Sequence, residues 1–171
     1  IVNPGNEKGL GCFEPSHDCL DNKINVNAGM RLRLACNKIM SNKKYNLEKA
    51  ECIITKAYNL PSKYIIETNA PIINKTLAEE DKEVLKNCYI NALKLAQENN
   101  IKTIAFPCIA TGQFNFPNKE AAEIFINFLC EKDSAYRIAE EIGYTTPHEG
   151  AMMEQDEDVR NNPGAYMPEE V

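Results

Sequence analysis

The sequence predicts a single domain of the α/β class, because short β-branched runs alternate with longer stretches of helical periodicity. The strand-like runs are residues 52–55 and 64–66, and the apolar run 101–109 is typical of a strand covered on both faces. At 171 residues, the chain is long enough for one domain with a hydrophobic core and too short for two ordinary domains.

The N-terminal part predicts the end of a strand, a turn and a helix. Residues 1–2 run directly into the turn-forming residues 3–6, and a helix is predicted for residues 22–40. Asp21 would be its N-cap or an acid in its first turn, and the free N–H groups there would equally favour a bound phosphate. The apolar residues at helical spacing are Ile24, Ala28, Leu32, Ala35 and Ile39.

The second half predicts further helices and a tail. Thr76 and Glu79 form a capping box before a helix, and Asn118 caps the next one. Their core-facing residues would be Val84, Leu85, Cys88, Ala92 and Ala96 in the first, and Ala121, Ala122, Phe125 and Leu129 in the second. Residues 135–142 could form a short helix, whereas residues 145–171 lack periodicity and predict an irregular acidic tail.

Composition limits the kinds of partner and the compartment. The net charge of -6 and the pI near 5.1 argue against non-specific attraction to nucleic acid. The seven cysteines are an odd number for a disulfide framework, so a reducing environment fits best. No run is apolar enough to span a bilayer, and the N-terminus has no signal-like segment. We therefore expect a cytoplasmic protein that binds neither nucleic acid nor membrane.

The strongest sign of chemistry is the segment 11–22, which places Cys12, His17 and Cys19 in one short loop. Two thiolates and one imidazole leave a fourth tetrahedral position open, as in catalytic zinc sites. A structural zinc site completed by a distant ligand such as Cys36 would explain the same residues, as would free thiols near a histidine. The residue types alone leave these interpretations open.

A second candidate site lies in residues 110–116, between a predicted strand and a predicted helix. Ligands bind at the carboxyl ends of strands in open α/β sheets, so this loop could hold a phosphate. Gly112 would let the backbone approach a ligand, Thr111 offers a hydroxyl, and Phe114 and Phe116 could stack on a ribose or a base. An ordinary strand-to-helix turn, with both aromatic residues in the core, is the alternative.

Three separated motifs occur in the chain: VNPGN at residues 2–6, ITKAYNLP at residues 54–61 and IAFPCIATG at residues 104–112. In this order they resemble the V-N-A-A-N, I-T-x-x-Y-N-L-P and I-A-F-P-x-I-S-T-G motifs of macro domains. The resemblance implies a three-layer α/β/α macro domain with a mixed central sheet in residues 1–144, followed by the tail 145–171. The sequence has no segment that matches the usual first strand of the family. It also has none that matches the last core strand, which would be expected near Lys132.

Residues 11–22 resemble the corresponding segment in the zinc-dependent microbial branch of this family. That branch is similar to hydrolases that remove mono-ADP-ribose from proteins. Some of these are encoded beside a sirtuin-type ADP-ribosyltransferase. The resemblance implies ADP-ribose as ligand, a mono-ADP-ribosylated protein as substrate and Zn²⁺ as cofactor. It implies metal ligands Cys12, His17 and Cys19, catalytic residues Asn6 and Asp21, and ligand-binding residues Asn22, Ala110, Thr111, Gly112, Gln113 and Phe114.

In the mechanism that this resemblance implies, the zinc ion lowers the pKa of a distal-ribose hydroxyl or of a water. Asn6 orients the distal ribose, Asp21 is the candidate general base, and the loop 111–114 wraps the diphosphate. A non-catalytic ADP-ribose reader, an O-acetyl-ADP-ribose deacetylase and a partner-binding domain with a structural metal are the alternatives.

The chain departs from the family pattern at three positions. Asn25 and Glu67 each stand at a position where the family often has His. Ala110 stands where Ser is usual, which removes one hydroxyl from the expected diphosphate loop.

Overall fold

The computed structural model describes residues 1–142 and 149–160, which fall in two compact units, residues 1–124 and 125–171. The first unit is built on a sheet of three strands: β1 (Val2–Gly5), β2 (Cys52–Lys56) and β3 (Tyr64–Asn69). Their order is β1-β3-β2, with β1 parallel and β2 antiparallel to β3. The sheet is therefore mixed, as predicted.

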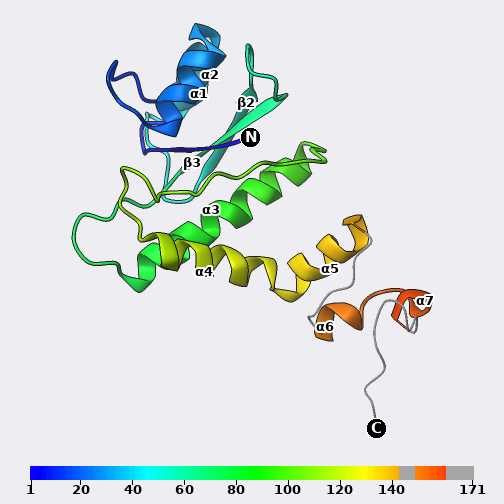
Figure 1. Ribbon diagram of the computed structural model, residues 1–171. Coiled ribbons are helices and arrows are strands. Elements are labelled where there is room, and N and C mark those ends of the chain that lie inside the picture. The colour runs from blue at the N-terminus through cyan, green and yellow to red at the C-terminus, as the bar shows by residue number, and fades with distance from the viewer. Residues whose placement is uncertain (143–148, 161–171) are drawn as a thin grey trace. The chain divides into compact units, whose positions relative to one another are not determined.

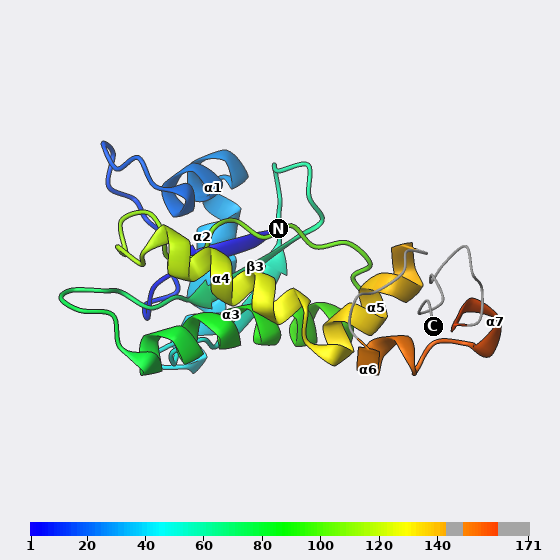
Figure 2. The same cartoon turned by 60° about the horizontal axis from the view of Figure 1, so that its bottom comes forward.

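Helices cover both faces of this sheet (Figures 1 and 2). On one face lie α1 (Leu20–Ala28) and α2 (Met30–Asn42), and on the other lies α3 (Glu79–Glu98). The central strand β3 is buried on both faces, with Ile65 in the cluster formed with α1 and α2. The core-facing residues of α3 are the predicted Val84, Leu85, Cys88, Ala92 and Ala96, together with Tyr89. The predicted three-layer α/β/α fold is confirmed.

The single helix predicted for residues 22–40 is wrong, because the chain forms two helices that are separated at Gly29. Gly29 has φ 86° and ψ 175°, a conformation that L side chains rarely adopt. Beyond the break Leu32 is buried as predicted, but the next buried positions are Cys36 and Met40 instead of the predicted Ala35 and Ile39. A glycine in a helical pattern is compatible with an uninterrupted helix, so the periodicity could not reveal the break.

The strand predicted for residues 101–109 is also wrong. The segment lies beside β1, the edge strand, and the Val2 N–H donates to the Ala105 carbonyl at 2.9 Å. A single such bond does not make a ladder, and Pro107 cannot donate one. Lys102, Ala105 and Cys108 are exposed, so the segment is not covered on both faces.

The remaining helices start and end near their predicted positions. Helix α3 begins at Glu79 after an extended Ala78, so Thr76 is not its cap; Asp81 instead accepts a hydrogen bond from the Ala78 N–H at 3.1 Å. Helix α4 spans Asn118–Leu129, where Ala121 and Phe128 are buried and the predicted Ala122 is exposed. Helix α5 spans Lys132–Ile142.

The segment predicted to be an irregular tail carries two short helices, α6 (Glu149–Met152) and α7 (Glu157–Arg160), within its described residues. The predicted domain boundary at residues 144–145 lies outside the described residues. Among the helices described, none has the length and apolar character needed to cross a membrane.

Candidate functional site

A cavity of about 540 Å³ opens in the first unit, within the range of small-molecule sites. It is lined by the end of β1, the loop before α1, and the loop after residues 101–109. The predicted site residues that line it are Asn6, Cys12, His17, Cys19, Asp21, Ala110, Thr111, Gly112, Gln113 and Phe114. The tertiary structure therefore joins the two candidate sites in one cavity.

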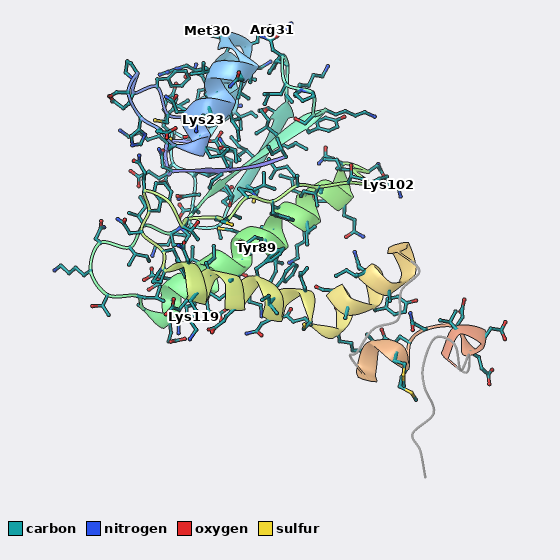
Figure 3. All side chains as sticks on the ribbon, viewed as in Figure 1. Lys23, Met30, Arg31, Tyr89, Lys102 and Lys119 are labelled. Atoms are coloured by element: carbon teal, nitrogen blue, oxygen red, sulfur yellow. The ribbon has the colours of Figure 1, made fainter. Side chains whose placement is uncertain are left out.

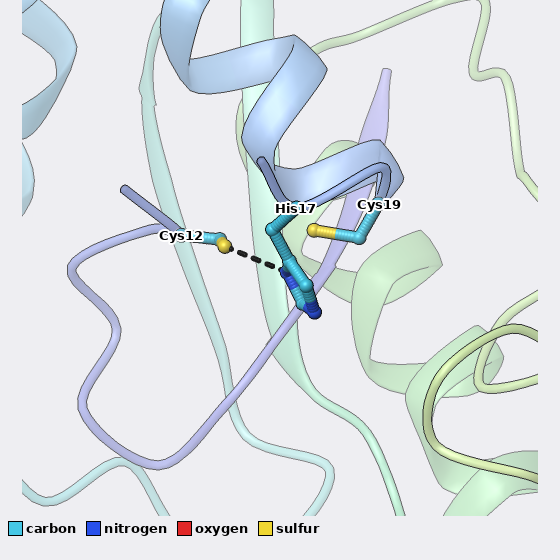
Figure 4. Close-up of side chains that lie close together, drawn as sticks. All are labelled: Cys12, His17 and Cys19. Carbon is cyan, nitrogen blue, oxygen red and sulfur yellow. Dashed lines mark hydrogen bonds between the residues drawn. The ribbon is translucent and has the colours of Figure 1, made fainter. Parts of the chain in front are cut away.

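The side chains of Cys12, His17 and Cys19 converge on one point (Figure 4). Their ligand atoms all lie within 4.8 Å of one another, and Cys12 Sγ lies 3.0 Å from His17 Nδ1. Ligand atoms around a tetrahedral zinc ion are roughly 3.6 Å apart, so this group fits Zn²⁺. Within the part of the chain described, no fourth Cys, His, Asp or Glu joins the group.

Cys36 is not placed to complete a closed structural site. It is buried in the layer between α2 and the sheet, where its Sγ lies 3.7 Å from Glu67 Oε2. Burial raises the pKa of this thiol to about 12, and the carboxyl of Glu67 acts in the same direction. Cys36 therefore stays a buried thiol.

The candidate metal-binding loop, residues 11–19, is held by the first turn of α1. Cys19 is the N-cap of that helix, and its Sγ accepts from the Asn22 N–H at 3.3 Å. The Asn22 amide donates to the carbonyls of Cys12 at 3.2 Å and Glu14 at 3.0 Å. Asn22, predicted to bind the ligand, is not among the residues that line the cavity and braces the loop instead.

Gly11 packs the same loop against α1. It has φ 80°, and a Cβ at this position would lie 2.4 Å from the side-chain amide of Asn25. The backbone approaches this closely only because glycine has no side chain. Asn25, the position where the resemblance led us to expect His, is thus part of the support of the candidate metal-binding loop.

Asp21 lies beneath the loop, almost completely buried. Its Oδ1 accepts hydrogen bonds from the side-chain amides of Asn3 and Asn25, each at 2.7 Å. Burial raises the pKa of Asp21, and the amide hydrogen bonds oppose this shift. Sequence reasoning missed Asn3 as a partner of Asp21; the available signal was a polar residue within a strand that is otherwise buried.

Asn6 lines the cavity at the end of β1, where its Oδ1 accepts from the Lys8 N–H at 3.0 Å. Its side-chain amide N–H groups have no acceptor among the described residues. Asn6 can therefore donate to a ligand without breaking a hydrogen bond of the protein.

The loop that follows residues 101–109 lines the cavity and carries consecutive backbone donors without a partner in the described residues. Among the described residues, none accepts from the N–H groups of Gly112, Gln113 and Phe114. The Thr111 hydroxyl donates to the Cys108 carbonyl at 3.0 Å, so it stabilises the loop. Phe114 lines the cavity, whereas Phe116 is buried in the core. Successive free N–H groups of this kind suit an anion such as a phosphate.

The arrangement is that of an α/β/α domain with a loop of free backbone N–H groups beside a cluster of two thiols and an imidazole. The family model for the Macro domain matches residues 2–125, and the chain belongs to the macro domain family.

Curated relatives are named for an activity. The "Protein-ADP-ribose hydrolase" of Staphylococcus aureus (strain MSSA476) is 40% identical over 143 residues, covering 81% of this chain and 54% of that protein. The protein of the same name from Treponema medium is 44% identical over 142 residues, with the same coverage. The chain thus spans about half the length of these relatives.

A solved structure is similar over most of the chain. The Oceanobacillus iheyensis macrodomain with ADP has a TM-score of 0.67 and 37% sequence identity, covering 75% of this chain and 65% of that one. The fold predicted from the sequence is therefore found in a relative that was solved with a nucleotide.

Proposed function

We propose that this chain is a zinc-dependent hydrolase that removes mono-ADP-ribose from modified proteins. The observation that carries the proposal is that one cavity joins the free N–H groups of residues 112–114 to the group Cys12, His17 and Cys19. The names of the two curated relatives support the same activity. A cytoplasmic location and a sirtuin-type ADP-ribosyltransferase as source of the substrate stay predictions.

In this proposal the N–H groups of Gly112, Gln113 and Phe114 bind the diphosphate of ADP-ribose. Gly112 leaves open space at the cavity, because a Cβ there would meet no atom within 4 Å. The ring of Phe114 packs against a ribose. The backbone carbonyl of Phe114 accepts a hydrogen bond from the Ile73 N–H at 2.8 Å. The loop is thus connected to the rest of the unit before the ligand binds.

At the other side of the cavity, Cys12, His17 and Cys19 would hold Zn²⁺. A bound zinc ion of this kind supplies Lewis acidity, which lowers the pKa of an oxygen ligand. The Asn6 amide orients the distal ribose. Asp21 Oδ2, which takes neither amide bond from Asn3 or Asn25, accepts the proton that the attacking water loses as its oxygen bonds to the anomeric carbon. The bond from that carbon to the modified side chain breaks, and the side chain leaves with the bonding electrons.

The test measures metal content and release of ADP-ribose from a mono-ADP-ribosylated protein, for the native chain and for Cys19→Ser. Serine keeps an oxygen acceptor at the N-cap of α1 but is a poor zinc ligand, so the variant should fold. Cys130→Ala is the matched control, because Cys130 is exposed and lies outside the metal group.

The proposal expects equimolar zinc and release in the native chain and in the control, with both lost in Cys19→Ser. Tight ADP-ribose binding without release would make the chain a reader. Release of acetate from O-acetyl-ADP-ribose, without release from the protein, would make it a deacetylase. Absence of both zinc and binding would reject the assignment.

A further inference from the structure

Phe13 is an exposed aromatic residue in the wall of the cavity. It follows Cys12 directly, and 38% of its surface is exposed although its ring is apolar. A single exposed aromatic side chain is ordinary on a protein surface, so what matters is where this ring lies and what holds it. None of the roles assigned above uses this ring.

The ring is held from one face by Arg33 of α2. The Arg33 Cζ lies 3.6 Å from the centre of the Phe13 ring, a close cation–π contact. Arg33 does not line the cavity, whereas Phe13 does, so the guanidinium covers the ring from outside the cavity. Phe13 is therefore a wall residue whose position is set before a ligand arrives.

The place of Phe13 in the cavity indicates what it contacts. Its neighbours along the chain are Cys12 and Glu14, at the side of the cavity where the metal group lies. The N–H groups of residues 112–114 suit the diphosphate, whereas the bond that joins ADP-ribose to the protein would be cleaved beside the metal group. Under the proposed function, the polypeptide that carries ADP-ribose would therefore lie on the side of the cavity where Phe13 is.

We propose that Phe13, held by Arg33, is the surface on which the polypeptide next to the modified residue packs, so that it determines preference for protein-linked over free ADP-ribose. The inference rests on the proposed function. Peptide planes and apolar side chains pack well on an aromatic face, whereas the anionic nucleotide is bound through the N–H groups of the loop.

The experiment compares Phe13→Ala and Phe13→Tyr with the native chain on a mono-ADP-ribosylated protein, on a ten-residue modified peptide from it, and on free ADP-ribose. Phe13→Ala should raise KM for both protein and peptide about tenfold, a loss of about 1.4 kcal/mol. Kd for free ADP-ribose should change less than twofold, and zinc content should not change. Phe13→Tyr, which keeps the ring, should restore the native KM.

A second pair of variants tests the part played by Arg33. Arg33→Ala should raise KM for the protein in the same way, because the ring is then no longer held. Arg31→Ala is the matched control, since Arg31, labelled at the start of α2 in Figure 3, lies over the Tyr58 ring at 5.2 Å and does not line the cavity.

Three outcomes would overturn the inference. An equal rise in KM for the protein and in Kd for free ADP-ribose would place Phe13 in the nucleotide site. Loss of zinc in Phe13→Ala would make the ring a support of the metal-binding loop. An unchanged KM would exclude contact with the polypeptide. If the native chain releases no ADP-ribose, the proposed function fails, but affinity for the modified protein relative to free ADP-ribose still tests Phe13.

Discussion

At position 112 the chain carries a glycine that the protein's own packing does not require. A Cβ there would meet no protein atom within 4 Å, in contrast to Gly11, where it would meet Asn25 at 2.4 Å. The left-handed glycines of the described residues are Gly9, Gly11 and Gly29, so Gly112 is not needed for backbone conformation either. The space at Gly112 therefore suits a ligand that approaches the backbone closely.

Gly112→Ala should weaken ADP-ribose binding about tenfold, or about 1.4 kcal/mol, because the added methyl group enters the space of the diphosphate. The free energy of unfolding should change by less than about 0.5 kcal/mol. Calorimetric titration with ADP-ribose and urea unfolding measure the two quantities. Unchanged affinity would mean that the loop does not contact the ligand.

At the scale of elements, the break between α1 and α2 sets the direction of both helices over the sheet. Gly29 ends α1, where its N–H donates to the Asn25 carbonyl at 3.1 Å, and its carbonyl accepts from the Leu32 N–H at 3.0 Å. A Cβ on Gly29 would lie 2.8 Å from Asn59 Nδ2. The break thus depends on both a left-handed backbone and a close neighbour.

Gly29→Ala should lower the free energy of unfolding by about 1–3 kcal/mol, since alanine is strained at this φ. Urea unfolding followed by circular dichroism measures the change. Gly112→Ala is the matched control, because it is the same substitution in open space at a position without positive φ. Equal stability of the two variants would show that α1 and α2 tolerate a different break.

At the scale of the whole molecule, the layers enclose a carboxylic acid. Glu67 on β3 is 2% exposed, and its Oε1 has no hydrogen-bond partner among the described residues. Burial raises the pKa of Glu67 to about 8, with a smaller contribution from the negative charge of Asp21. The folded protein therefore keeps the proton of Glu67 at pH values where the unfolded chain has lost it.

This difference makes stability fall as the pH rises. Between the ordinary pKa of 4.5 and about 8, unfolding releases one proton from Glu67, which costs up to about 1.4 kcal/mol of stability per pH unit. Glu67→Gln is neutral in both states, so its stability should vary less with pH. Urea unfolding at several pH values measures both slopes, and parallel slopes would show that Glu67 is ionised in the folded protein.

Local patterns in the sequence predicted much of the fold. The strands β2 and β3 and the buried face of α3 follow from β-branched runs and from helical spacing, which depend on neighbouring residues. Cys12, His17 and Cys19 could be identified as candidate ligands because they lie within a few positions of one another. Residues 101–109 were predicted incorrectly because a strand needs a paired neighbour, which an apolar run cannot reveal.

Local residue patterns were enough to predict the α/β class, the candidate metal ligands Cys12, His17 and Cys19, and the glycine-bearing loop after residues 101–109. Packing of the elements in three dimensions decided that both loops line one cavity and that Asn3 and Asn25 hold Asp21. It also decided that Arg33 covers Phe13. These contacts bring together residues on different elements, whose distances depend on how helices pack on the sheet and leave no periodic signal along the chain.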